Sequence, residues 1–109
     1  MKLDSLILSC NKITEINNIG YSPNLTILDL KNNKLSVLSK EISFLKNLKT
    51  LDLTNNDLTD LPSEIGFLDK LVRFHLEGNS LKVIKHSVRS AGAEVYYFIF
   101  ELKLNIFRL

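Results

Sequence analysis

One pattern of leucines and asparagines recurs four times along this chain of 109 residues. The pattern is L-x-x-L-x-L-x-x-N, and its most complete copy lies within residues 48–68. Both residue types recur after 22, 23 and 23 residues, at Leu3, Leu25, Leu48 and Leu71 and at Asn11, Asn33, Asn56 and Asn79. Because two residue types share one period, the chain is expected to be an array of similar units rather than a domain packed around one central core.

A period of this length with this consensus indicates a leucine-rich repeat. The residues around L-x-L alternate as in a strand with one buried face, and stacked units place such strands side by side in a parallel sheet. We therefore predict an α/β leucine-rich repeat solenoid, with parallel strands on the concave face and short helices or 3-10 turns on the convex face. Four repeats are predicted within residues 1–84, at about 3–24, 25–47, 48–70 and 71–84.

The asparagine at the end of each pattern has a structural interpretation. Where the chain leaves a strand, backbone polar groups point inward, and buried backbone groups must find partners. An asparagine amide provides both donors and an acceptor. We therefore predict a stacked row of four asparagines that bond successive turns, in preference to an asparagine-lined binding site.

The two ends of the chain differ from the repeats between them. Residues 85–109 lack the leucine pattern, and we predict a C-terminal helical cap there, apolar nearly all round. Its uncharged run is too short to span a membrane, and the alternative role for its apolar surface is to seat a partner or to self-associate. Only Met1 and Lys2 precede Leu3, although the first unit of a solenoid normally needs a cap with a polar outer face, which favours a chain that ends a longer array.

Charge and cysteine content narrow the class of protein. The net charge of +2 is close to balanced and gives no reason to expect nucleic acid or an acidic membrane as the main partner. Cys10 is the single cysteine, so an intrachain disulfide is impossible. The first apolar run is interrupted by Asp4 and Ser5 and does not form a signal peptide. These features predict a reduced, cytoplasmic protein.

The sequence contains no phosphate loop, zinc-ligand spacing, nucleophile elbow or dinucleotide fingerprint. We therefore predict a protein that is not an enzyme and has no cofactor and no metal. Asp52 beside His75, with Thr54 near, resembles a catalytic triad, but nothing positions the hydroxyl or forms an oxyanion hole. Asp29 and Asp52 supply one carboxylate pair, whereas a hard divalent cation takes about six or more oxygens. A solvated acidic stripe suited to a basic patch on a protein partner is the favoured interpretation.

Strand alternation leaves three rows of side chains on the outer face of the predicted sheet. The central row is Ile7, Asp29, Asp52 and His75, and the flanking rows are Ser5, Ile27, Thr50 and Arg73, and Ser9, Lys31, Thr54 and Glu77. Solenoids commonly bind through such concave surfaces. The predicted partner-binding residues are Ile7, Ile27, Asp29, Lys31, Thr50, Asp52, Thr54, Arg73, His75 and Glu77.

The sequence LPSEIG at residues 61–66 resembles the consensus of intracellular, Ras-group leucine-rich repeat proteins. Residues 76–85, with Val88 and residues 91–92, are similar to the closing segment of the group that contains leucine-rich repeat-containing protein 40 and its plant relatives. The similarity departs from that group's charged tail at residues 96–100. It implies a non-catalytic scaffold that binds a protein partner, such as a small GTPase or another signalling protein. The alternative is a structural C-terminal fragment of a longer repeat protein, with no binding activity of its own.

Overall fold

In this computed structural model, residues 4–80 are described, apart from the side chains of Tyr21 and Ser63 and the exposure of Gly66. Strands and 3-10 helices alternate along the chain: β1 (Ser5–Ile7), η1 (Ile19–Tyr21), β2 (Ile27–Asp29), η2 (Lys40–Phe44), β3 (Thr50–Asp52), η3 (Ser63–Phe67) and β4 (Arg73–His75). Each strand and the 3-10 helix that follows it make one turn of a solenoid. The predicted cap at 85–109 and the end of the fourth repeat lie outside the described residues.

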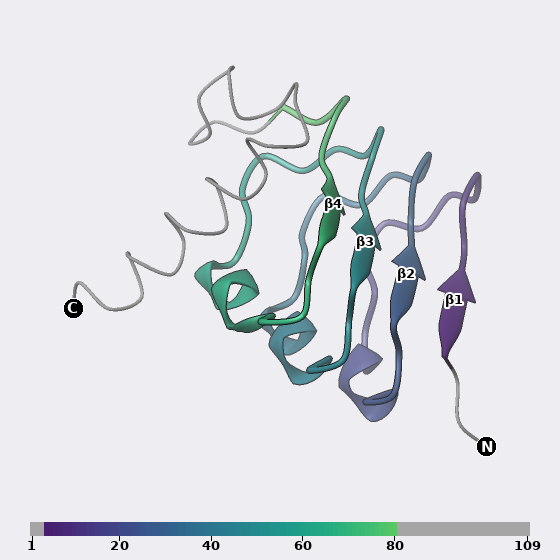
Figure 1. Cartoon of the computed structure of the whole chain (residues 1–109). Helices are drawn as coiled ribbons and strands as arrows, with labels where there is room; N and C mark the ends of the chain where they lie inside the picture. The colour runs from purple at the N-terminus through teal and green to yellow at the C-terminus, as the bar shows by residue number, and fades with distance from the viewer. Residues whose placement is uncertain (1–3, 81–109) are drawn as a thin grey trace.

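The strands form one parallel sheet in the order β1-β2-β3-β4, as predicted (Figure 1). Backbone bonding continues beyond the short strands, because Leu8 N donates to Asp29 O at 2.8 Å and Leu30 N donates to Asp52 O at 2.8 Å. Leu53 N makes the same bond to His75 O at 2.9 Å. These bonds fix each turn in register with the next one, and the sheet forms one side of the solenoid.

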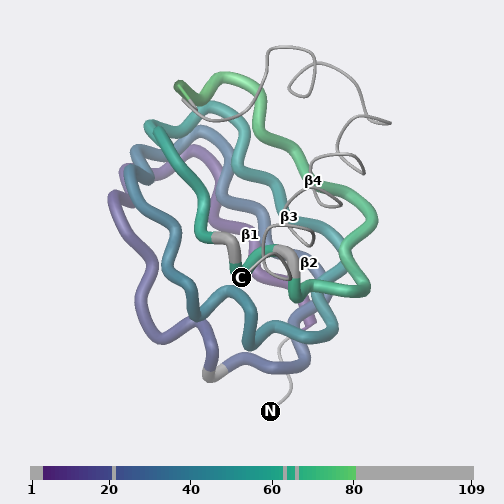
Figure 2. Tube along the Cα trace, turned by 90° about the vertical axis from the view of Figure 1, so that its left-hand side faces the viewer, coloured from purple at the N-terminus to yellow at the C-terminus, as the bar shows by residue number. Residues whose placement is uncertain are grey.

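The core lies between the sheet and the 3-10 helices. The consensus leucines of the second and third repeats fill it, together with Phe74 from β4, which is 1% exposed. Ile19, Ile42 and Ile65 enter from the three 3-10 helices on the opposite side and are also buried. Figure 2 shows the successive turns stacked on one another, the arrangement in which each repeat buries its apolar face against its neighbours.

Three of the four pattern asparagines form the predicted ladder. Asn56 donates to Leu30 O of the preceding turn at 2.9 Å and to Leu53 O of its own turn at 3.1 Å, and its Oδ1 accepts from Leu35 N at 2.9 Å. Asn33 and Asn79 are buried and bonded in the same way.

The prediction is wrong for the first asparagine of the row. Asn11 is exposed, and its amide donates only within its own turn, to Leu8 O at 2.8 Å and Ser9 O at 3.1 Å. The physical reason is that the structure describes no preceding turn whose carbonyl and N–H would complete the set.

The convex elements are short because each repeat must return to the sheet within 23 residues or fewer. Ser39 caps η2, and its hydroxyl accepts from Glu41 N at 3.1 Å. Pro62 precedes η3 and has no N–H to satisfy. Each helix is followed by a leucine whose N–H donates back to a buried isoleucine carbonyl, Leu45 to Ile42 and Leu68 to Ile65.

Candidate functional site

The concave face of the solenoid, formed by the exposed side of the sheet, carries the predicted rows in alignment. Ile7 pairs with Asp29, Asp29 with Asp52, and Asp52 with His75. Two residues earlier along each strand, and therefore on the same face, Ser5, Ile27, Thr50 and Arg73 form the second row. None of these side chains is buried. The parallel register therefore brings residues from four distant sequence positions onto one continuous surface, about 4.8 Å apart from strand to strand.

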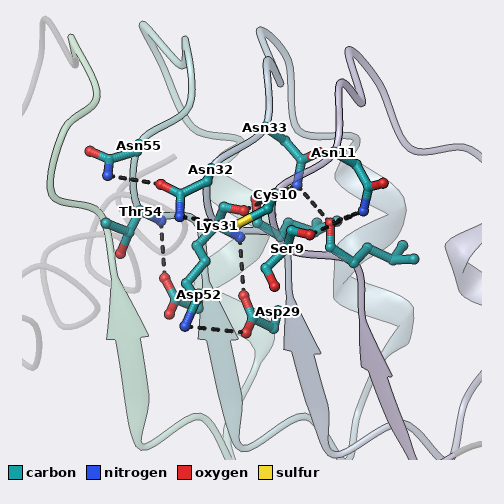
Figure 3. Close-up of polar contacts among 12 residues, drawn as sticks. Ser9, Cys10, Asn11, Asp29, Lys31, Asn32, Asn33, Asp52, Thr54 and Asn55 are labelled. Atoms are coloured by element: carbon teal, nitrogen blue, oxygen red, sulfur yellow. Dashed lines mark hydrogen bonds and ion pairs between the residues drawn. The ribbon is translucent and has the colours of Figure 1, made fainter.

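Each of the two central aspartates accepts a hydrogen bond from a backbone N–H of its own turn (Figure 3). Asp29 Oδ1 accepts from Lys31 N at 3.1 Å, and Asp52 Oδ1 accepts from Thr54 N at 3.0 Å. Asp29 Oδ2 also lies 3.7 Å from Lys31 Nζ, and its side chain is only 15% exposed. Asp52 has no such ion-pair partner among residues 4–80. The acidic character of the centre therefore rests mainly on Asp52.

An apolar patch occupies the β1–β2 side of the same face. Ile7 is 57% exposed and Ile27 is 37% exposed. Ile27 stands opposite Ser5, so the two isoleucines are diagonal neighbours on adjacent strands. Two adjacent exposed isoleucines form an apolar contact area beside a polar centre.

The geometry gives no support to the catalytic-triad alternative. Thr54 Oγ1 donates to Glu77 Oε2 at 3.4 Å, so the hydroxyl is directed to a carboxylate on β4's continuation rather than to the imidazole of His75. Within the described chain, no cluster of three or more histidine, cysteine, aspartate or glutamate side chains is arranged to hold a metal ion. The part of the chain between residues 4 and 80 also has no helix of the length and apolarity needed to cross a bilayer.

A second column, which the sequence analysis missed, runs along the edge where the strands end. It consists of the residue before each pattern asparagine, and all four have positive φ: Cys10 (60°), Asn32 (57°), Asn55 (56°) and Gly78 (76°). Asparagine and glycine tolerate this left-handed conformation best, so their recurrence at this position was the available signal.

Side-chain bonds connect three members of this column (Figure 3). Asn55 Nδ2 donates to Asn32 Oδ1 at 2.9 Å, and Asn32 Nδ2 donates to Cys10 Sγ at 3.6 Å. At Gly78, a Cβ atom would collide with Asn55 Oδ1, so glycine is needed there both for its φ and for the close approach. This column, called the rim below, is therefore a polar edge linked by side-chain hydrogen bonds from turn to turn.

The leucine rich repeat family model matches the chain twice, over residues 1–58 and 23–81. A search of curated protein sequences finds no match. A leucine-rich repeat protein of Leptospira interrogans has a solved structure that is 40% identical, with a TM-score of 0.75, and the match covers 92% of this chain and 24% of that protein.

Two plant structures are also similar. The peptide hormone receptor RGFR1 in complex with RGF2 matches with a TM-score of 0.67 and 32% identity, over 72% of this chain and 14% of the receptor. The BIR2 ectodomain from Arabidopsis thaliana matches with a TM-score of 0.65 and 27% identity, over 72% of this chain and 44% of that ectodomain. Members of this family typically act in protein–protein interaction without catalysis. The repeating sequence, the parallel sheet and the family match together show that this chain belongs to the leucine-rich repeat family.

Proposed function

We propose that the chain binds a protein partner through its concave face. The observation that carries this proposal is the aligned register. It places an apolar patch, an aspartate that has no ion pair within residues 4–80, and the mixed-charge residues 73–77 side by side. A peptide hormone bound to a structurally similar receptor shows that a related repeat protein takes a peptide partner. An open sheet with several kinds of side chain suits an extended surface contact better than a small-molecule pocket.

The order of the side chains defines the chemistry of the partner. Exposed Ile7 and Ile27 favour an apolar side chain at the β1–β2 side. Asp52 favours a basic side chain over β3, and Arg73 favours an acidic side chain over β4. Because neighbouring strands are about 4.8 Å apart, these three contacts would span roughly 10–15 Å across the sheet. A short stretch of a protein or peptide with apolar, basic and acidic groups in that order is the expected ligand.

The resemblance to Ras-group repeat proteins supports a finer proposal, a cytoplasmic scaffold in signalling, with a small GTPase or another signalling protein as the partner. It rests on the LPSEIG sequence at residues 61–66 and on the single cysteine. The alternative is a structural C-terminal fragment of a longer leucine-rich repeat protein, with no binding activity of its own. The chain spans 24% of the length of the Leptospira protein that it matches. One experiment separates the two.

The experiment compares quantitative capture of proteins by the tagged parent chain and by two concave-face variants, Asp52→Asn and Ile27→Asp. Asp52→Asn keeps an oxygen acceptor for Thr54 N and removes only the charge, so the turn stays in place. We expect about tenfold or greater loss of the same proteins from both variants, since truncating a central contact costs about 2 kcal/mol or more.

Lys40→Gln, on the exposed surface of η2, is the matched control and should capture as the parent does. Retained capture by both concave-face variants would contradict the concave-face proposal. No specific capture by the parent chain would favour the structural alternative.

A further inference from the structure

An aromatic residue recurs at the last position of each 3-10 helix, on the convex side of the solenoid. Phe44 ends η2 and Phe67 ends η3, 23 residues later, and Tyr21 holds the same place in the sequence of η1. The side chain of Phe44 is 58% exposed and that of Phe67 is 42% exposed. Phe44 and Phe67 thus expose apolar surface on adjacent turns that the described chain does not bury, although burial would be favourable.

The chain itself provides a cation for one of the two rings. Lys46 Nζ lies 5.7 Å from the centroid of the Phe67 ring, a distance at which an ammonium group is attracted by the ring face. Lys46 follows Phe44 by two residues, and the corresponding residue one repeat earlier, 23 residues before Lys46, is Pro23. The Phe44 ring therefore lacks the cation that the Phe67 ring has, within the described part of the chain.

A hollow lies beside the Phe44 ring. It is lined by Asn18, Gly20, Glu41 and Phe44 and has a volume of about 130 Å³. This is several times the roughly 30 Å³ that a water molecule occupies in the liquid, so the hollow has room for the head group of a side chain. A Cβ atom on Gly20 would lie 2.7 Å from Cδ2 of Phe44, so the ring rests directly against the glycine backbone, where any larger residue would displace it.

A carboxylate stands on the same side of the helix as the ring. Glu41 and Phe44 are three residues apart in η2, and side chains with this spacing eclipse one another in a 3-10 helix. The described residues contain no ion-pair partner for Glu41. An unpaired carboxylate beside an exposed ring, above a hollow, is complementary to a flat organic cation.

We propose that the hollow beside Phe44 receives a cationic side chain of a protein partner, an arginine, in the place that Lys46 occupies over Phe67. Arginine fits better than lysine because its planar guanidinium stacks on an aromatic face while presenting paired N–H donors to a carboxylate. The site is on the convex side of the solenoid, away from β1–β4. It is thus a second contact surface, independent of the concave-face proposal.

The test uses the ¹⁵N-labelled full chain titrated with N-acetyl-arginine amide, and in parallel with the uncharged N-acetyl-citrulline amide. We expect saturable chemical-shift changes at the Gly20 and Glu41 amides with the arginine compound, at millimolar concentration, and none with citrulline. Phe44→Leu and Glu41→Gln should each weaken this binding about 2- to 30-fold, the range expected from losing a cation–π contact of about 0.5–2 kcal/mol or a comparable ion pair.

Pro23→Lys is the sharpest variant, because it places a lysine where Lys46 stands one repeat later and should occupy the hollow from within the chain. Pro23 is exposed, and Asn47 Nδ2 donates only to its carbonyl, at 3.2 Å, so the substitution keeps that bond. We expect Pro23→Lys to weaken binding of the arginine compound severalfold. Phe67→Leu, the matched control, should leave the Gly20 response unchanged.

Equal responses to arginine and citrulline would overturn the proposal, as would parent-like binding by both Pro23→Lys and Phe44→Leu. Dispersion of the amide spectrum verifies that each variant is folded. Asp52→Asn should leave the Gly20 response unaffected, so failure of the concave-face proposal and failure of this one are read separately.

Discussion

Repeats one and three share the same consensus but differ in the burial and the hydrogen bonding of their consensus residues. Leu6 and Leu8 of the first repeat are half-buried, whereas Leu51 and Leu53, at the same positions of the third, are completely buried. The asparagines differ in the same direction. The amide of Asn56 bonds two turns, and that of Asn11 bonds only its own.

The difference shows that the same consensus residue can be buried and hydrogen-bonded to different extents in different repeats. Its burial and its hydrogen bonds are supplied by the turns on either side, so the energy of each repeat is shared with its neighbours. Repeat three has described turns on both sides, and repeat one has a described turn on only one side. Paired substitutions at equivalent positions measure how much of the stability comes from those contacts.

The leucines should give the largest contrast. Leu53→Ala removes a side chain with 0% exposure and leaves a cavity between adjacent turns, so the free energy of unfolding should fall by about 2–5 kcal/mol. Leu8→Ala removes a half-buried side chain from a site that solvent can fill, and we expect a loss of about 1 kcal/mol. Urea unfolding of both variants, followed by circular dichroism, measures the contrast. Equal losses would show that the first repeat is packed as tightly as the third.

The asparagines should give the next contrast. Asn56→Ala leaves the buried Leu35 N without its acceptor, whereas Leu30 O keeps the bond from Asn33 Nδ2. One unsatisfied buried group costs about 1–3 kcal/mol, so a loss in that range is expected. Asn11→Ala exposes two carbonyls that water can reach, and the loss should be about 0.5–1 kcal/mol. The same unfolding experiment applies. A large effect at Asn11 would mean that another turn covers it.

Much of the fold was predictable from two periods in the sequence, the two-residue alternation along each strand and the repeat length of about 23 residues. Alternation of side chains along a strand identifies the buried leucines and the outer rows, and the 23-residue step aligns those rows across β2, β3 and β4. The convex 3-10 segments were predicted as well. These features depend on backbone geometry repeated from unit to unit, which a single sequence displays directly.

The rest depends on individual side-chain partners. The sequence does not show that Lys31 bends back to Asp29 and reduces the charge of the acidic centre. Nor does it show that Lys46 reaches the ring of Phe67 in the next turn. Long side chains choose among several nearby partners, so their contacts are settled by rotamer and local packing rather than by the repeat period. Whether the predicted partner-binding residues bind anything stays a prediction.

The rim column offers a third contrast, between φ strain and a steric clash. Gly78→Ala forces a non-glycine residue to φ near 76° and places its Cβ against Asn55 Oδ1. We expect a loss of about 1–2 kcal/mol from the conformation alone, and more from the clash. In an Asn55→Gly background the clash is absent, so only the conformational cost should remain. If the two backgrounds give the same loss, Asn55 moves freely and the rim is not rigid.

The smallest expected effect lies on the convex side, where repeats two and three begin their helices differently. Ser39 caps η2 through its hydroxyl, whereas Pro62, at the same position before η3, makes no side-chain bond. Ser39→Ala should therefore lower the free energy of unfolding by about 0.5–1 kcal/mol, since the N–H of Glu41 loses its acceptor but stays accessible to water. Ser36→Ala is the matched control, because Ser36 is exposed and its backbone N–H, bonded to Thr14 O at 3.3 Å, is unaffected by the change. Equal stability of the two variants in urea would show that η2 needs no cap, and that packing of Ile42 alone holds the outer helix, as Ile65 does in η3.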